Sequence, residues 1–431
     1  MAAMMTDAYD LPLTTASPAA RERYDAGTRG LLGWKASALE SFDAATAADP
    51  ALAVAHAGAA VCHFLDERFD EARAAGERAR AAAAGQSARE RGHAESIALL
   101  VTGKVGDAER AMREHLGGFP RDLSILQRLY ILWFWQGRFP EMLALTSSHA
   151  RFSPGDSFIV GMHAFALEQA DRCDEAIRVA QAALTANPDD AWAVHALAHT
   201  LYEMEAYDTA IRRLPPATHA CQDLNWFRNH LYWHLALLHL AAGDEARASD
   251  MCRQAFEREP SSIAGNLHDS ISLLWRLGLA RHDIGARWAP FVTIARERYP
   301  KIGLLYHQTH LAMALAAGGD WEHAEKQLES YRGKVSRDRT GLIGPVVIPL
   351  LEGIGAFARG DYARAIERLE PGRDRWVHLG GSRAQRDVFT DTLLEACFRA
   401  GDAERAERLL AERVARRRDH FSLTANGRRA R

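Results

Sequence analysis

The sequence predicts an all-α solenoid, in which pairs of antiparallel helices stack into a superhelix with a concave inner face. Three observations lead to this fold: a landmark that recurs along the chain, apolar residues at helical spacing between landmarks, and no stretch with the alternation of a strand. With 431 residues, 48% of them hydrophobic and 25% charged, the chain can bury a large core.

The landmark is a Gly or polar turn residue followed five positions later by a small residue. The small residues are Ala38, Ala72, Ala111, Ala176, Ala210, Ala248, Ala324, Ala365 and Ala406, with Met142 standing in for one alanine. Ala38 and Ala72 are 34 residues apart, as are Ala176 and Ala210. This is the length of a tetratricopeptide repeat (TPR). We therefore predict a TPR-type superhelix of about ten to eleven helix-turn-helix repeats.

Helix ends and helix contacts fit the same repeat. Pro50, Pro154 and Pro188 each fall twelve residues after a landmark, where proline ends the second helix. Small residues eight places into the first helix let the two helices of a pair approach closely. These residues are Ala60, Ala164, Ala198, Ala236, Ala312 and Gly353.

The predicted organisation has three parts. Residues 1–18 form an extended N-terminal lead, and residues 19–414 form the superhelix. Ala248 and Ala324 are 76 residues apart, which places an irregular repeat near 265–300. Residues 415–431 are rich in arginine and read as a basic, disordered tail, solvated and without function.

Composition and charge argue against several kinds of partner and indicate a cellular compartment. The net charge of -3 argues against nucleic acid and against an anionic membrane. The five cysteines are scattered singly, as expected for reduced thiols in the cytoplasm. No basic start with an apolar run and no eighteen-residue apolar window is present, so we expect a soluble protein. Apolar edges on the terminal helices are compatible with a homodimer.

Polar residues of unusual type gather on the predicted inner face, which TPR resemblance assigns to repeat positions 2, 5, 9, 12 and 13. With Ala210 as position 20, four inner residues share one face of a helix: Trp192, His195, His199 and Glu203. With Ala248 as position 20, the next first helix supplies His230, Trp233 and His234. Two H-x-x-x-H pairs thus stand on consecutive first helices.

Four histidines arranged in this way predict a metal site. Histidines at i and i+4 can ligate one ion, and packed helices lie roughly 8 to 10 Å apart, a gap that two imidazoles can span. The predicted ligands are His195, His199, His230 and His234, and the cofactor is a divalent metal such as zinc or iron.

Further candidate residues extend the predicted inner face. They are His268 and Asp269, then Tyr306, His307 and His310, and finally the carboxylates Glu352 and Asp391. The carboxylates could complete a metal site or act as general acid or base. Each histidine has a plainer interpretation, as a polar residue in a wet groove or a core residue bonded to a backbone carbonyl. The tryptophans could equally belong to the core.

Sequence blocks in 192–389 carry a closer resemblance. AVHALAHTLYEME, NHLYWHLALLHLAAGD, LHDSISLLWRLGL, YHQTHLAMALAAGGDW and GGSRAQRDVF are similar to the tetratricopeptide repeat protein 38 family. The resemblance implies a helical repeat protein found in bacteria and animals, and it implies no catalytic residues. Familiar catalytic motifs such as G-x-S-x-G and H-E-x-x-H are absent from the sequence.

Two functions remain open at this point. The first is a non-catalytic scaffold that binds a peptide or protein in the groove, the usual work of TPR stacks. The second is a pocket for a small molecule or metal; if the chain is an enzyme, a metal-dependent hydrolase or oxidoreductase fits best. In a closed superhelix, Asp391 and Glu352 would approach His199 and His234, and the polar inner face would become such a pocket.

Overall fold

The computed structural model describes residues 5–299, 301 and 303–418, and most of this part of the chain is helical. The first helix of each pair is α1 (Pro18–Leu32), α3 (Ala53–Leu65), α5 (Ala88–Val101), α7 (Leu123–Phe134), α9 (Ser157–Gln169), α11 (Ala191–Glu203), α13 (Phe227–Ala241), α15 (Ala264–Leu279), α17 (Leu305–Ala317), α19 (Ile348–Ala358) or α21 (Arg383–Ala400). The second is α2 (Ala38–Ala48), α4 (Phe69–Ala83), α6 (Val105–Gly118), α8 (Phe139–His149), α10 (Cys173–Ala186), α12 (Tyr207–Ala220), α14 (Glu245–Cys252), α16 (Ala289–Arg298), α18 (Trp321–Arg332), α20 (Tyr362–Leu369) or α22 (Ala403–Arg418).

Eleven helix pairs therefore follow one another within the described ranges, and the predicted all-α TPR superhelix is confirmed. Short helical segments lie in the connections: η1 (Ala150–Phe152), η2 (Arg253–Glu257), η3 (Gly285–Trp288), η4 (Val335–Arg337), η5 (Ile343–Val347) and η6 (Glu370–Leu379). The only sheet within the described residues is an antiparallel pair of two-residue strands, β1 (Met5–Thr6) and β2 (Pro12–Leu13).

The turn between the two helices of a pair explains the sequence landmark. Nine of these turns contain a residue with positive φ, five positions before the small residue: Glu67, Gly103, Gly137, Asp171, Glu205, Gly243, Gly319, Gly360 and Gly401. After α5, for example, the amide of Lys104 donates to the carbonyl of Leu99 at 3.0 Å. A left-handed residue followed by this bond ends a helix and satisfies its last carbonyls.

One predicted landmark is out of register. Ala111 was expected at the small position of its repeat, but the left-handed turn residue is Gly103, so Ala108 holds that position. Ala108 is fully buried whereas Ala111 is partly exposed. The motif GDAERA in this repeat lies inside α6 and is a chance match to the turn. With Ala108, the interval to Met142 is 34 residues.

The small residues in the first helices allow the close packing that was predicted. A Cβ at Gly353 would lie 2.6 Å from the side chain of Leu369, in the partner helix α20. Ala60, Ala164 and Ala236 are fully buried. The helices of a pair therefore meet at distances that leave no room for larger side chains.

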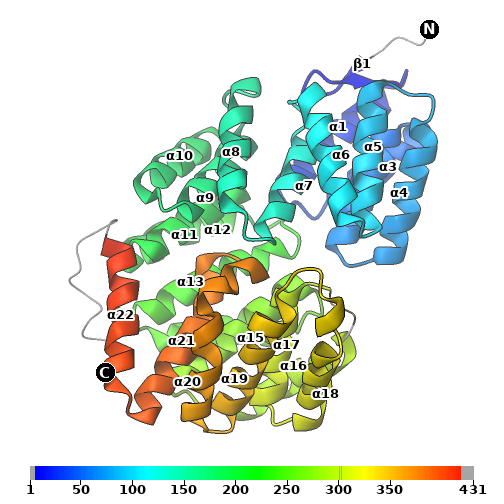
Figure 1. Cartoon of the computed structure of the whole chain (residues 1–431). Coiled ribbons are helices and arrows are strands. Elements are labelled where there is room, and N and C mark those ends of the chain that lie inside the picture. Colours follow the sequence, from blue (N-terminus) through cyan, green and yellow to red (C-terminus); the bar gives the residue numbers. More distant parts are fainter. Residues whose placement is uncertain (1–4, 300, 302, 419–431) are drawn as a thin grey trace.

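The superhelix closes on itself. Helix α21 contacts not only α19 but also α15 and α11, which belong to much earlier pairs. The turn after α1 likewise meets the loop before α13, where the amide of Asn225 donates to the carbonyl of Trp34 at 2.8 Å. Figure 1 shows the C-terminal helices beside the green middle of the chain. The inner face of the middle repeats is thus covered by other parts of the same chain.

The ends of the chain differ in what the structure describes. The predicted lead contains the β1–β2 hairpin, and the predicted tail begins inside α22, which continues to Arg418. The rest of that tail, 419–431, lies outside the described residues. All five cysteines are buried and unpaired. None of the helices within the described ranges combines the length and hydropathy needed to cross a bilayer.

Candidate metal centre

The site is built on two neighbouring first helices, α11 and α13. Helix α11 begins at Asp190, whose carboxylate accepts a hydrogen bond from the amide of Ala193 at 3.1 Å. All thirteen residues of α11 are buried, so this helix is covered on every side. A helix that is buried all round can place polar side chains in the interior only where they have partners.

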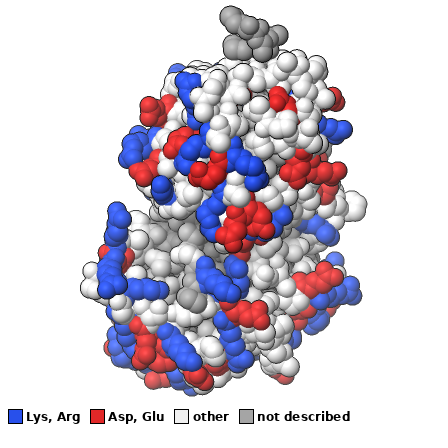
Figure 2. All heavy atoms as spheres, turned by 90° about the vertical axis from the view of Figure 1, so that its right-hand side faces the viewer, with Lys and Arg blue, Asp and Glu red and all other residues white. Residues whose placement is uncertain are grey.

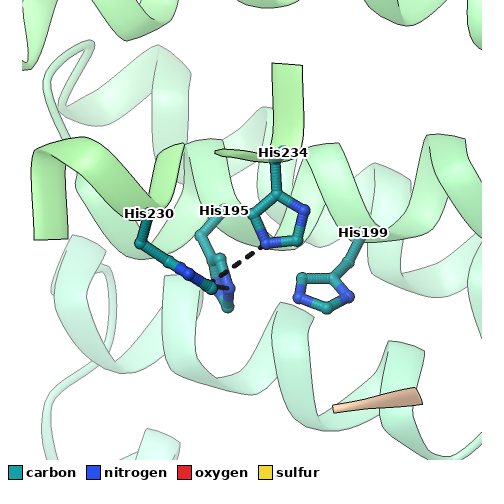
Figure 3. Close-up of side chains that lie close together, drawn as sticks. All are labelled: His195, His199, His230 and His234. Atoms are coloured by element: carbon teal, nitrogen blue, oxygen red, sulfur yellow. Dashed lines mark hydrogen bonds between the residues drawn. The ribbon is translucent and has the colours of Figure 1, made fainter. Parts of the chain in front are cut away.

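The four predicted metal-ligating histidines converge between these helices. His195 Nε2 lies 3.0 Å from His230 Nε2, and His234 Nε2 lies 3.2 Å from the same His230 atom. The rings of His199 and His234 are 4.3 Å apart, centroid to centroid. One nitrogen from each of the four rings can be chosen so that all lie within 4.8 Å of one another. Figure 3 shows the rings directed toward a common point.

Burial decides the protonation of this cluster. The four side chains are between 0% and 6% exposed. Burial lowers the pKa of His195, His199 and His234 well below the usual value, and the neighbouring imidazoles lower it further. His195, His199 and His234 are therefore neutral at physiological pH, which is the form that ligates a metal.

A carboxylate on the next first helix orients one of the rings. His230 Nδ1 lies 2.8 Å from Asp269 Oδ2, and His268 Nε2 lies 3.0 Å from Asp269 Oδ1. Burial alone would raise the pKa of Asp269, but His230 and His268 hold it well below its usual range. Because the ionised carboxylate accepts a hydrogen bond from Nδ1–H of His230, the Nε2 atom of that ring carries the lone pair and faces His195 and His234.

A second carboxylate lies beside His199. Glu168, from α9, places Oε2 3.8 Å from His199 Nδ1 and is fully buried. Burial, together with the charge of Glu203, raises the pKa of Glu168 to about 8. Neither ring nitrogen of His199 has a hydrogen-bond partner among the residues that the structure describes. His199 therefore has two buried nitrogens with no hydrogen bond, a costly arrangement unless another group binds them.

Aromatic rings enclose the cluster. The ring of Phe165 is 4.7 Å from that of His195 and 5.0 Å from that of His199, and Phe227 packs on His195 at 5.3 Å. Trp192 joins Trp34 at 5.8 Å in the same layer, and both are buried. Trp233 is fully buried and donates from Nε1 to Ser272 Oγ at 3.0 Å. Trp192 and Trp233, the two tryptophans of the predicted site, thus pack as core residues around the histidines.

The remaining predicted histidines form a separate group. His268 Nδ1 lies 2.8 Å from the carbonyl of Ala264, and His310 Nδ1 lies 2.9 Å from the carbonyl of Tyr306. His307 packs on the ring of Trp135, with centroids 4.8 Å apart. Asp269 joins this group to the four-histidine cluster. His268 and His310 therefore have the backbone bonding that the plainer interpretation of a core histidine describes.

Three predicted carboxylates pair with arginines away from the ring nitrogens. Glu352 binds Arg332 at 2.8 Å and Arg368 at 3.2 Å, and Asp391 binds Arg413 at 2.7 Å and Arg276 at 3.2 Å. The expected approach of Glu352 and Asp391 to His199 and His234 is not found. Helix α21 does return to α11 and α15, but Asp391 pairs with these arginines. Glu203 lies 3.9 Å from Arg383 and 3.7 Å from Arg416.

Sequence reasoning missed several neighbours of the cluster. Phe165 is eleven residues before Ala176, so it holds repeat position 9, as His199 does in the next repeat. The assignment of repeat positions 2, 5, 9, 12 and 13 to the inner face could therefore have found Phe165. Phe227 and Gln385 carry no such signal; Gln385 Nε2 reaches His268 Nε2 at 2.9 Å only because α21 folds back on α15.

A second group of potential ligands was also missed. His93 Nδ1 and His115 Nε2 lie 2.8 and 3.0 Å from Asp122 Oδ2. Arg89 donates to the same oxygen at 3.1 Å and also to Asp7 at 3.1 Å. Since Asp122 Oδ2 already accepts from a guanidinium, this group is a hydrogen-bond network that anchors the N-terminal hairpin.

Known proteins resemble this chain only weakly. No protein-family model matches the chain. Among solved structures, the human IFIT1 dimer with PPP-AAAA is 12% identical, covers 91% of this chain and 94% of its own, and has a TM-score of 0.43. The APC/C hetero-tetramer Cut9-Hcn1 is 12% identical over 87% of this chain and 76% of its own (TM-score 0.41). MamA MSR-1 C2 is 20% identical, and the match covers 39% of this chain and 95% of its own, with a TM-score of 0.29. These values are too low to transfer a ligand or partner.

Proposed function

We propose that this chain is a metal-binding TPR protein that holds one divalent transition-metal ion between α11 and α13, with His195, His199, His230 and His234 as ligands. The observation that carries the proposal is the convergence of four buried imidazoles, with one nitrogen of each ring within 4.8 Å of the others. A single buried histidine is ordinarily bonded to a carbonyl, but here imidazoles face imidazoles.

The spacing of the nitrogens suits an ion. Two nitrogens, each about 2.0–2.1 Å from a tetrahedral ion, stand about 3.3 Å apart. The His195–His230 and His230–His234 nitrogen pairs, at 3.0 and 3.2 Å, are close to this value. The widest pair in the cluster, at up to 4.8 Å, requires a rotation of its rings toward the centre.

The charge around the site also favours a cation. Asp269 supplies a buried negative charge through His230. An aspartate bonded to the second nitrogen of a ligating histidine is a common support of metal sites, because it fixes the ring and raises its basicity. An all-imidazole set suits zinc, iron or nickel, and zinc is our first choice because it accepts four ligands tetrahedrally.

Four protein ligands favour a structural ion over a catalytic one. Catalytic zinc keeps an open position for water or substrate, whereas structural sites use four protein ligands. The ion would join α11 to α13 where the superhelix closes. Hydrolase or oxidoreductase chemistry would require one histidine to leave the ion, and His199 beside Glu168 is the residue placed to do so.

The alternative of a peptide-binding scaffold needs another surface. Helix α21 packs across α11 and α15, and the inner-face histidines are buried, so a peptide could reach them only by displacing α21. Membership of the tetratricopeptide repeat protein 38 family is part of the same proposal and rests on the sequence blocks in 192–389.

Elemental analysis of the purified protein tests the proposal. We expect about one zinc, iron or nickel ion per chain, lost in His199→Ala and in His234→Ala with the helical circular dichroism spectrum kept. His239→Ala is the matched control, since His239 is on α13 but bonds Asp244 at 3.1 Å. The proposal fails if the wild-type protein neither contains such an ion nor gains thermal stability when zinc, iron or nickel is added.

A further inference from the structure

A separate pocket of about 290 Å³ lies between η6, α21 and α22. Five arginines line it together with three acidic residues and a few apolar side chains. The arginines are Arg373, Arg383, Arg386, Arg413 and Arg416, and the acids are Asp374, Asp387 and Glu412. We call it the arginine pocket. Its size is at the lower end of the range for pockets that bind small molecules.

Three of the arginines are paired with carboxylates at close range. Arg373 binds Glu412 at 2.5 Å, Arg413 binds Asp391 at 2.7 Å, and Arg383 binds Asp171. These guanidinium groups have their charge compensated within the protein. They shape the pocket and leave little unsatisfied charge in it.

The other two arginines form no hydrogen-bonded pair with a carboxylate among the described residues. Arg386 donates to the carbonyl of Gly381 and stacks over Phe139, but it forms no ion pair within the described residues. Burial and the charge of Arg383 lower the pKa of Arg386 to about 10. Arg416 forms ion pairs with Asp387 at 3.6 Å and Glu203 at 3.7 Å, but its buried Nε and Nη2 make no hydrogen bond within the described part of the chain.

We propose that the arginine pocket binds a phosphate monoester, whose dianionic group lies between Arg386 and Arg416. Two guanidinium groups on one small pocket match the charge and the fork geometry of a phosphate. Trp376, Val377 and Leu409 supply the apolar part of the wall, against which the carbon portion of the ligand would pack. This site is independent of the proposed metal centre, because none of its lining residues is one of the four histidines.

Isothermal titration calorimetry on the full chain tests this site. The probes are glycerol 3-phosphate and inorganic phosphate, with succinate as a dianion of different shape and potassium chloride at equal ionic strength as the blank. We expect saturable binding of both phosphate compounds, tighter than that of succinate. We expect Arg416→Gln and Arg386→Gln each to weaken the binding by about tenfold or more.

A variant on the same helix controls for general loss of charge. Arg408, also on α22, pairs with Glu370 and lies outside the pocket. We expect Arg408→Gln to bind the probes as the wild type does. If Arg386→Gln does not fold, Arg416→Gln decides alone, because this side chain is 34% exposed and its loss leaves the core intact. The site is refuted if no probe binds beyond chloride, if Arg416→Gln binds as tightly as wild type, or if succinate binds as tightly as the phosphates.

Discussion

His230 and Asp269, 39 residues apart in the sequence, meet across the contact between α13 and α15 with Nδ1 2.8 Å from Oδ2. This one bond sets which nitrogen of His230 faces the other imidazoles. Among the described residues, Asp269 is the only buried carboxylate that is hydrogen-bonded to the four-histidine cluster. The proposed metal centre therefore depends on Asp269, which also contacts His268 in the neighbouring group of histidines.

The first prediction concerns this bond. Asp269→Asn keeps the size of the side chain but removes its charge, so His230 becomes a poorer ligand. We expect the affinity for zinc to fall by about 10- to 100-fold, measured by competition with a chelating dye. Ser270→Ala serves as control, because Ser270 Oγ bonds only the carbonyl of Asn266 on its own helix. An unchanged affinity in Asp269→Asn would contradict the assigned role.

The second prediction compares two buried tryptophans. Trp233 Nε1 donates to Ser272, whereas Trp192 Nε1 finds no hydrogen-bond partner in the described part of the chain. The substitution Trp→Phe removes the same atoms at both places, but at Trp233 it also leaves the Ser272 hydroxyl without its donor. We expect Trp233→Phe to lower the free energy of unfolding by about 1 kcal/mol more than Trp192→Phe, measured by urea denaturation. Equal losses would contradict the bond to Ser272.

The third prediction concerns the pH dependence of stability. Burial first, and then the charge of His268, lower the pKa of His310 to about 3 in the folded chain, whereas an unfolded histidine titrates near about 6.5. Between these values the unfolded chain binds a proton that the folded chain does not. The free energy of unfolding is therefore highest above about pH 6.5 and falls toward pH 3, by up to about 1.4 kcal/mol per pH unit from this residue.

The measurement is urea denaturation at pH 7.5, 6 and 5. His310→Gln should flatten the slope, and the partly exposed His56, whose Nε2 lies 2.9 Å from the carbonyl of Pro50, provides the control His56→Gln. The charged or titratable groups around His310 include Tyr306, His268, His307, Arg276 and Asp269. A slope that His310→Gln leaves unchanged would assign the effect to another of the buried histidines.

The fourth prediction applies one substitution at two glycines that lie three residues apart. Gly103 has a φ of +74° in the turn after α5, and Gly106 lies in α6. An added Cβ meets nothing within 4 Å at either place. We expect Gly103→Ala to destabilise the chain by about 1 kcal/mol and Gly106→Ala to stabilise it by about 0.5–1 kcal/mol. The opposite order in a thermal melt would show that the turn is not where the structure places it.

The repeat period was enough to predict which residues share a face. His195 and His230 are 35 residues apart in the sequence, and successive first helices lie side by side, so their meeting follows from one repeat length. The error at Ala111 has the opposite origin. A six-residue match to the turn motif lay within a helix, and only the backbone distinguishes Gly103 from Gly106 as the turn residue.

Contacts between distant repeats could not be predicted in this way. Whether Asp391 approaches His234 depends on the small rotation between successive pairs, summed over several pairs, and on insertions such as η6. No residue pattern encodes that sum. The arginines that take up Asp391 and Glu352 are likewise scattered over four helices, and the sequence assigned them no role.

The return of α21 onto α11, and of the turn after α1 onto the loop before α13, has a consequence for unfolding. In an open array each repeat touches only its neighbours, so the ends fray and a denaturant melts the array in steps. Here the loss of either end removes partners from the middle of the chain. The chain should therefore unfold as one cooperative unit, with amide exchange in α11 as slow as that of global unfolding.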